Sequence, residues 1–123
     1  MKQHFNKSIG FYGESLACTI LKSNGYKLLE RNFSCKFGEI DIIALKDHIL
    51  CFIEVKTRTS SKYGFPCESI NYYKQKKLGR LAQFYVIKKG LTNHFLRFDA
   101  LEIFLNSIDN NYDFNLIENA IYF

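Results

Sequence analysis

Two short apolar runs, separated by three polar residues, constrain the fold of this chain more than any other feature. Residues 40–45 and 49–55 carry the β-branched and aromatic side chains that favour strands, and the connection at 46–48 is short enough for a hairpin. The second run is apolar at successive positions, which is typical of a strand buried on both faces at the centre of a sheet. The two runs therefore predict a pair of adjacent strands inside the core.

Acidic and basic side chains flank these runs at matching ends. Glu39 and Asp41 stand at the start of the first run, and Glu54 and Lys56 stand at the end of the second. Side chains two residues apart in a strand point to the same face, so the members of each pair lie together. In a hairpin the start of one strand lies beside the end of the next. We therefore expect two or three carboxylates and one ammonium group to converge.

Such a cluster has a definite chemical use. Carboxylate oxygens are the ligands that hard divalent cations prefer, and a lysine beside them completes a set that suits phosphodiester hydrolysis. Ionised side chains at the end of a central strand are costly to bury unless they are paired, hydrated or bound to a metal. The pattern indicates a metal-dependent nuclease. The alternative is an ordinary ion pair between Lys56 and the carboxylates of Asp41 and Glu54.

Length and composition exclude several other classes. A chain of 123 residues fits one domain, residues 1–123. No apolar stretch approaches the ~20 residues of a membrane span, and the first residues lack the apolar segment of a signal peptide, so we expect no membrane association and a cytoplasmic location. The four cysteines and three histidines do not have the spacing of zinc ligands.

Positive charge is concentrated in the first part of the chain. Residues 1–90 hold sixteen of the seventeen lysines and arginines against seven acids, a net charge of +9, whereas residues 91–123 have a net charge of −4. A basic surface of this kind suits a polyanion such as nucleic acid. The alternative is a basic surface that is simply solvated.

The remaining elements follow from the spacing of apolar residues. Helical spacing that ends at a glycine predicts helices over residues 8–24 and 71–89. Tyr12 in the first helix and Phe95 in a later strand are expected in the core. Together the elements predict an α/β fold with a mixed sheet flanked by helices, in the order αβββαββ. Further strands are predicted at residues 26–33, 95–104 and 115–122.

Short motifs spread along most of the chain match a known pattern as a set. They are Gly13-Glu14, Gly25-Tyr26, Arg31-Asn32-Phe33, Gly38-Glu39-Ile40-Asp41, Glu54-Val55-Lys56-Thr57-Arg58, Gly64-Phe65-Pro66 with Glu68 and Lys74, and Arg97-Phe98-Asp99. On these residues the chain resembles the YraN-like family of bacterial proteins, in the PD-(D/E)XK nuclease superfamily. That family is itself similar to archaeal Holliday junction resolvases. The resemblance implies a restriction-endonuclease-like core.

The resemblance also implies roles for individual residues. Asp41 and Glu54 would bind a divalent metal, Mg²⁺ or Mn²⁺, and the carbonyl oxygen of Val55 would complete the inner shell. Lys56 would orient or deprotonate the attacking water. Glu14 in the first helix would hold a water on the metal, or a second metal.

Four basic residues, which follow the second run or begin the second helix, are expected to contact nucleic-acid phosphates: Arg58, Lys62, Lys74 and Lys77. The leading hypothesis is a metal-dependent endonuclease that acts on DNA, in particular on branched or otherwise structured DNA. The alternative is a module on the same fold that binds nucleic acid or a partner protein without catalysis. Similarity to resolvases favours a homodimer, because a two-fold symmetric enzyme can cut two strands symmetrically.

Overall fold

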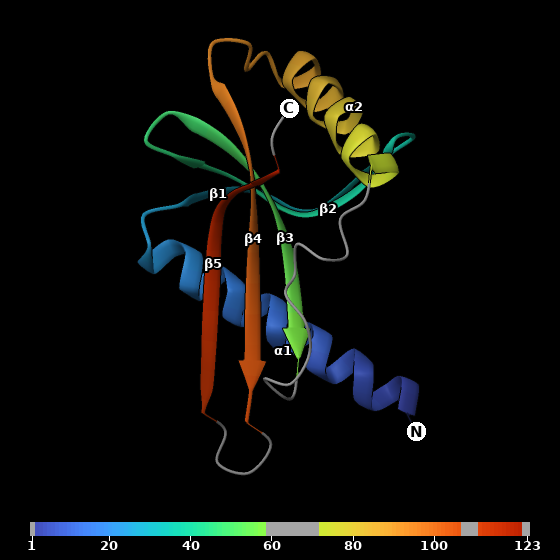
Figure 1. The fold of residues 1–123 in the computed structure, drawn as a ribbon, viewed down its shortest axis with the longest axis vertical. Helices are drawn as coiled ribbons and strands as arrows, with labels where there is room; N and C mark the ends of the chain where they lie inside the picture. Colours follow the sequence, from blue (N-terminus) through green and yellow to red (C-terminus); the bar gives the residue numbers. More distant parts are fainter. Residues whose placement is uncertain (1, 59–71, 107–110, 122–123) are drawn as a thin grey trace.

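The computed structural model describes residues 2–58, 72–106 and 111–121 (Figure 1). These ranges form two helices and five strands in the order αβββαββ, which confirms the predicted α/β class and element order. The elements are α1 (Lys2–Ser23), β1 (Lys27–Cys35), β2 (Gly38–Lys46), β3 (Ile49–Arg58), α2 (Tyr72–Lys89), β4 (Phe95–Leu105) and β5 (Tyr112–Ile121).

The five strands form one mixed sheet in the order β1-β2-β3-β4-β5, with β3 at its centre. The pair β3–β4 is parallel, and the other three pairs are antiparallel. Parallel neighbours need a crossover connection, and α2 lies in the chain between β3 and β4. The central place of β3 agrees with its apolar character on both faces.

The predicted hairpin is formed by β2 and β3, which are joined by a tight two-residue turn. Asp47 and His48 occupy this turn with φ values of 50° and 67°. Two successive residues with positive φ are characteristic of a turn that matches the twist of its flanking strands. The resulting register pairs Ile42 with Ile53. Asp41 and Glu54 are the next residues outward along each strand.

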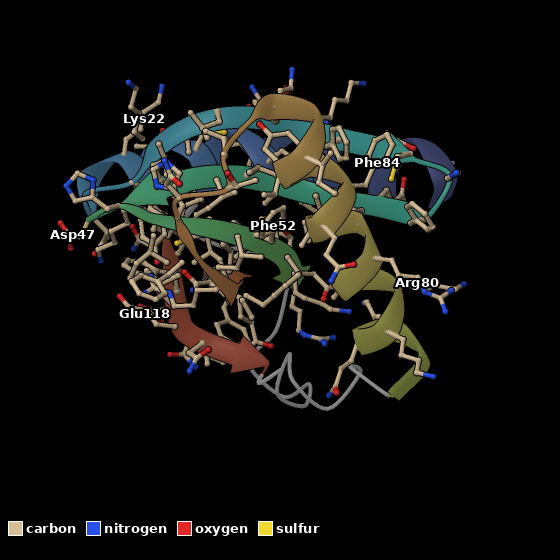
Figure 2. All side chains as sticks on the ribbon, turned by 90° about the horizontal axis from the view of Figure 1, so that it is seen from above. Lys22, Asp47, Phe52, Arg80, Phe84 and Glu118 are labelled. Atoms are coloured by element: carbon tan, nitrogen blue, oxygen red, sulfur yellow. The ribbon has the colours of Figure 1, made fainter. Side chains whose placement is uncertain are left out.

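Each face of the sheet is covered by a helix. On one face α1 packs across β3 and β4, and Figure 1 shows it crossing these strands. On the other face α2 packs over β2, and Phe52 of β3 lies in the cluster beneath it (Figure 2). Neither described helix has the length and apolar character of a membrane span.

Two residues expected in the core are exposed. Tyr12 is 49% exposed because α1 turns a neighbouring stripe toward the sheet, with Gly13 and Ala17 buried. Phe95 is 83% exposed, since it is the first residue of β4 and lies at the end of the sheet. The prediction that both side chains lie in the core, which used apolar character alone, is therefore wrong. The last strand is also longer than predicted, because β5 begins at Tyr112.

Candidate active site

A small cleft lies between β2, β3 and the first turns of α2. Its volume is about 150 Å³. Acidic side chains come from the two strands, and a basic one comes from the helix. The lining residues are Glu39, Ile40, Asp41, Glu54, Lys74 and Leu78. The cleft therefore contains three of the carboxylates that flank the two apolar runs.

Asp41 is held in this cleft by the neighbouring strand. The backbone N–H of Val55 donates a hydrogen bond of 2.7 Å to its Oδ2 atom. Burial raises the pKa of Asp41, the Val55 hydrogen bond opposes that change, and the carboxylates of Glu54, Glu14 and Glu39 raise the pKa further. Four acids are thus close enough to repel one another. A cation placed among them would relieve this repulsion.

Glu54 is contacted by two lysines. Its Oε1 atom lies 2.5 Å from Nζ of Lys74 and 3.6 Å from Nζ of Lys56. Both Glu54 and Lys56 lie within β3, which runs on to Arg58, whereas the sequence pattern placed them at the end of the strand. Their shared face follows from the two-residue spacing. The structure therefore brings Asp41 and Glu54 into one cleft and places Lys56 beside Glu54.

Glu14 approaches from the opposite layer, on α1. A close contact between helix and strand brings it near: a Cβ on the preceding Gly13 would lie 3.0 Å from Cβ of Thr57, and closer still to its Oγ1. Glu14 lies 4.0 Å from Nη2 of Arg31 and is near enough to influence the pKa of Asp41. It does not line the cleft. Its side chain reaches the group of acids electrostatically rather than by direct contact.

A buried ion pair, which the sequence pattern did not indicate, lies beside these residues. Glu102 of β4 is 1% exposed, and its Oε2 atom is 3.2 Å from Nε of Arg58. The parallel register pairs Glu102 with Lys56, so the pair adjoins the candidate site. An acid inside an apolar strand is a signal in itself, because a buried charge needs a partner. Arg58, expected to contact phosphate, is thus largely engaged by a carboxylate.

The other expected phosphate contacts are placed differently. Lys74 lies in the cleft, and Lys77 is exposed on α2. Lys62 lies outside the described residues. Of the two expected contacts on α2, Lys74 therefore faces the acids and Lys77 faces solvent.

The cleft contains carboxylate oxygens of the kind that a hydrated cation binds. Mg²⁺ keeps several waters and needs only one or two carboxylates from the protein, which Asp41 and Glu54 could provide. The cleft volume leaves room for such waters. Within the described ranges, no three or more His, Cys, Asp or Glu side chains are grouped so that they could hold a metal ion. A cation that uses Glu54 would also compete with the ammonium groups of Lys56 and Lys74.

A second buried polar cluster lies around Asp99 and accounts for the Arg97-Phe98-Asp99 motif. Arg97 donates two hydrogen bonds to Asp99, at 2.8 Å and 3.0 Å. The hydroxyl of Tyr26 and the backbone N–H of Asn119 donate two more, at 2.8 Å and 2.9 Å. Asp99 therefore joins β4 to β5 and to the segment that follows α1. This cluster is a structural clamp.

These features define a class: an α/β protein with a mixed sheet in which two neighbouring strands contribute acids to one cleft, with a lysine of the central strand beside one of those acids. The chain belongs to UPF0102, an uncharacterised protein family whose model matches residues 13–103. The matched range includes Glu14, Asp41, Glu54 and Lys56. The predicted family membership is thereby confirmed.

Relatives share this sequence almost from end to end. A UPF0102 protein of Clostridium botulinum (strain 657 / Type Ba4) is 52% identical over 116 residues, which cover 94% of each chain. A UPF0102 protein of Clostridium acetobutylicum is 48% identical over 115 residues, again 94% of each chain. The similarity therefore extends over nearly the whole chain.

Proposed function

We propose that this protein is a metal-dependent endonuclease that hydrolyses phosphodiesters of DNA, in particular of branched or otherwise structured DNA. One observation carries the proposal: Asp41 and Glu54 share a cleft on neighbouring strands, and Nζ of Lys56 lies 3.6 Å from Glu54. A structural ion pair needs one acid for one lysine. The acids around Asp41, which add to the effect of burial in raising its pKa, favour a site for a cation.

Each residue of the candidate site has a separate role in the proposed reaction. Asp41 and Glu54, with the carbonyl oxygen of Val55, would hold Mg²⁺ or Mn²⁺, which supplies Lewis-acid chemistry and neutralises charge developing on the phosphate. Lys56 orients the attacking water or, in its neutral amine form, accepts a proton from that water. Lys74 turns from Glu54 to a phosphate oxygen when DNA binds. Glu14 orients water at the edge of the site.

Basic residues outside the cleft would hold the DNA backbone. Lys77 is exposed one turn after Lys74 on α2, so a strand that reaches Lys74 can also contact Lys77. Lys62 follows β3 in the chain, and Arg58 supports that end of the strand through Glu102. A dimer would let two such sites cut two strands of a junction symmetrically.

The test is a cleavage assay on single-stranded, duplex, flapped and four-way DNA with Mg²⁺ or Mn²⁺. We expect cutting that stops when a chelator is added. Glu54→Ala and Lys56→Ala should each abolish it, with unchanged circular dichroism. Lys22→Ala removes an exposed lysine at the end of α1 and serves as the matched control. Undiminished cutting by both site variants would show that the activity comes from elsewhere.

A binding module on the same fold is the second candidate. It is favoured by the ammonium groups of Lys56 and Lys74, which both lie within ion-pair distance of Glu54 and neutralise its charge. In that case the protein binds nucleic acid or a partner protein without chemistry. Tight, salt-sensitive binding to DNA with no cutting under any divalent ion would select this candidate over the endonuclease.

A further inference from the structure

A second groove lies between α2 and the turn that joins β1 to β2. Its volume is about 400 Å³. Figure 2 shows Phe84 turned toward the strands and Arg80 turned outward from the same helix. The groove is therefore apolar on its inner side and basic at its rim. The lining residues are Lys36, Phe37, Arg80, Gln83, Phe84 and Ile87.

Aromatic rings form the inner side of this groove. The ring of Phe84 lies 6.0 Å from that of Phe37, at an angle of 64°, and 6.4 Å from that of Phe33. All three rings are half-buried, so packing holds them in place while part of each stays open. Ile87 extends the apolar surface and is 75% exposed. Such a surface suits a flat apolar group that can lie against it.

Cations surround the rings. Nζ of Lys36 lies 5.2 Å from the ring centre of Phe37, and Nζ of Lys88 lies 5.7 Å from that of Phe84. Arg80 is exposed beside them. Among the described residues that line the groove there is no carboxylate. Three cations around apolar rings favour a ligand that carries both negative charge and flat rings, which is the composition of a nucleic-acid strand.

An unpaired base offers a free face to such rings, whereas a base inside a duplex does not. In a duplex each base is already stacked on its neighbours, whereas bases of a single strand stack readily on aromatic side chains. The lysine ammonium groups that now lie over the rings can move to the adjacent phosphates, because both side chains are exposed and long. The groove therefore favours single-stranded over fully paired DNA.

The groove and the candidate active site both lie along α2. Lys74 and Leu78 line the cleft, whereas Phe84 lies further along the same helix. Phe84 is ten positions after Lys74, a distance of about 15 Å at the rise of an α-helix. A strand of B-form DNA covers about 15 Å in four or five nucleotides.

We propose that the groove formed by Phe37, Phe84 and Arg80 binds an unpaired base of the DNA substrate within a few nucleotides of the bond that is cut. This inference rests on the proposed endonuclease function and narrows its substrate. The enzyme acts on DNA in which a single-stranded arm leaves a duplex. Phosphates of that arm bind Arg80, Lys36 and Lys88, and its base stacks on the two rings.

The test measures binding in a chelator, so that cutting plays no part. A forked duplex with two unpaired arms is compared with a blunt duplex of the same paired length, by fluorescence anisotropy. The wild-type protein should bind the fork more tightly, and 2-aminopurine in an arm should be quenched by stacking. Phe84→Leu keeps an apolar side chain but removes the ring. It should weaken binding to the fork about fivefold or more and leave the blunt duplex unchanged.

Phe37→Leu is the second variant and should also weaken binding to the fork. It keeps the test valid if circular dichroism shows that Phe84→Leu disturbs the packing of the protein. Phe114→Leu is the matched control, because Phe114 is 43% exposed on β5, away from the lining of the groove. Equal wild-type affinity for both DNAs, or a preference that survives both groove variants, overturns the inference. If the protein prefers the fork but cuts no DNA, the result contradicts only the proposed endonuclease function and leaves this inference standing.

Discussion

The backbone N–H of Val55 donates a hydrogen bond of 2.7 Å to Oδ2 of Asp41. Val55 stands between Glu54 and Lys56, whose side chains point to the face opposite its own. One hydrogen bond therefore positions Asp41 relative to both Glu54 and Lys56. The same bond explains how a buried carboxylate is accommodated, since it partly offsets the rise in the pKa of Asp41 that burial causes.

Asp41→Asn tests whether that carboxylate holds a metal. The asparagine keeps an oxygen that can accept the Val55 hydrogen bond but removes the charge that burial and neighbouring acids disfavour. Without divalent ions, the variant should therefore be at least as stable as the wild type at neutral pH. The wild type should gain melting temperature with Mg²⁺, because a ligand that binds only the folded state stabilises it. The variant should lose this gain and all cleavage.

Differential scanning fluorimetry with Mg²⁺ or chelator provides the measurement. Asp113→Asn is the control, since Asp113 is exposed on β5 and should not alter the response to Mg²⁺. An equal rise in melting temperature for Asp41→Asn and the wild type would remove Asp41 from the metal site.

Lys74 and Lys77 should differ in their effect on the metal. Lys74 lies 2.5 Å from Glu54, whereas Lys77 is exposed on the same helix. Lys74→Ala removes a competing ammonium group and should tighten Mg²⁺ binding, measured by calorimetry, while Lys77→Ala should not. Both lysines are expected to contact phosphate. Replacing them together should therefore reduce the slope of log DNA affinity against log salt concentration by roughly one to two units. Unchanged Mg²⁺ affinity in Lys74→Ala would contradict the competition.

The β2–β3 hairpin could be predicted because its signals are local. Isoleucine-rich composition, a short polar connection and the two-residue period all lie within residues 38–58. The same patterns misplaced the end of β3, because residues 56–58 are polar and resemble a loop. They are strand residues because β4 pairs with them, as Arg58 with Phe104. That pairing partner is far away in the sequence.

Contacts between distant elements could not be predicted in this way. Tyr26 and Asp99 are 73 positions apart, and their hydrogen bond depends on the strand order and register. The pair Arg58–Glu102 likewise depends on the parallel register of β3 and β4. Sequence patterns indicate which residues are polar inside apolar segments. They do not indicate which of these residues meet, because pairing is decided by tertiary packing.

Gly13→Ala tests the close contact that brings Glu14 to the acids. An alanine in a helix is ordinarily more stable than glycine, by about 1 kcal/mol. Here the added Cβ would lie 3.0 Å from Cβ and Cγ2 of Thr57, so we expect a loss of about 1 to 3 kcal/mol in the free energy of unfolding instead. Thr57→Ala removes the Oγ1 and Cγ2 atoms and should restore part of that loss in the double variant. Urea denaturation of the four proteins gives the coupling energy. Additive effects would show that α1 and β3 do not meet at this point.

Tyr26→Phe tests the clamp around Asp99 through its dependence on pH. Burial, reinforced by Asp99, raises the pKa of Tyr26 above its ordinary value of 10.0, so the folded state keeps a proton that the unfolded chain loses above that pH. Stability of the wild type should therefore fall as pH rises above 10.0, because the unfolded state then binds fewer protons.

At neutral pH the variant should be less stable by about 1 to 3 kcal/mol, since Asp99 loses a buried donor. Phenylalanine does not ionise, so the difference should shrink in alkali. Burial also raises the pKa of Cys51, to about 12, but that thiol is present in both proteins. Urea denaturation across this pH range provides the measurement, and a difference that stays constant into alkali would show that Tyr26 ionises equally in both states.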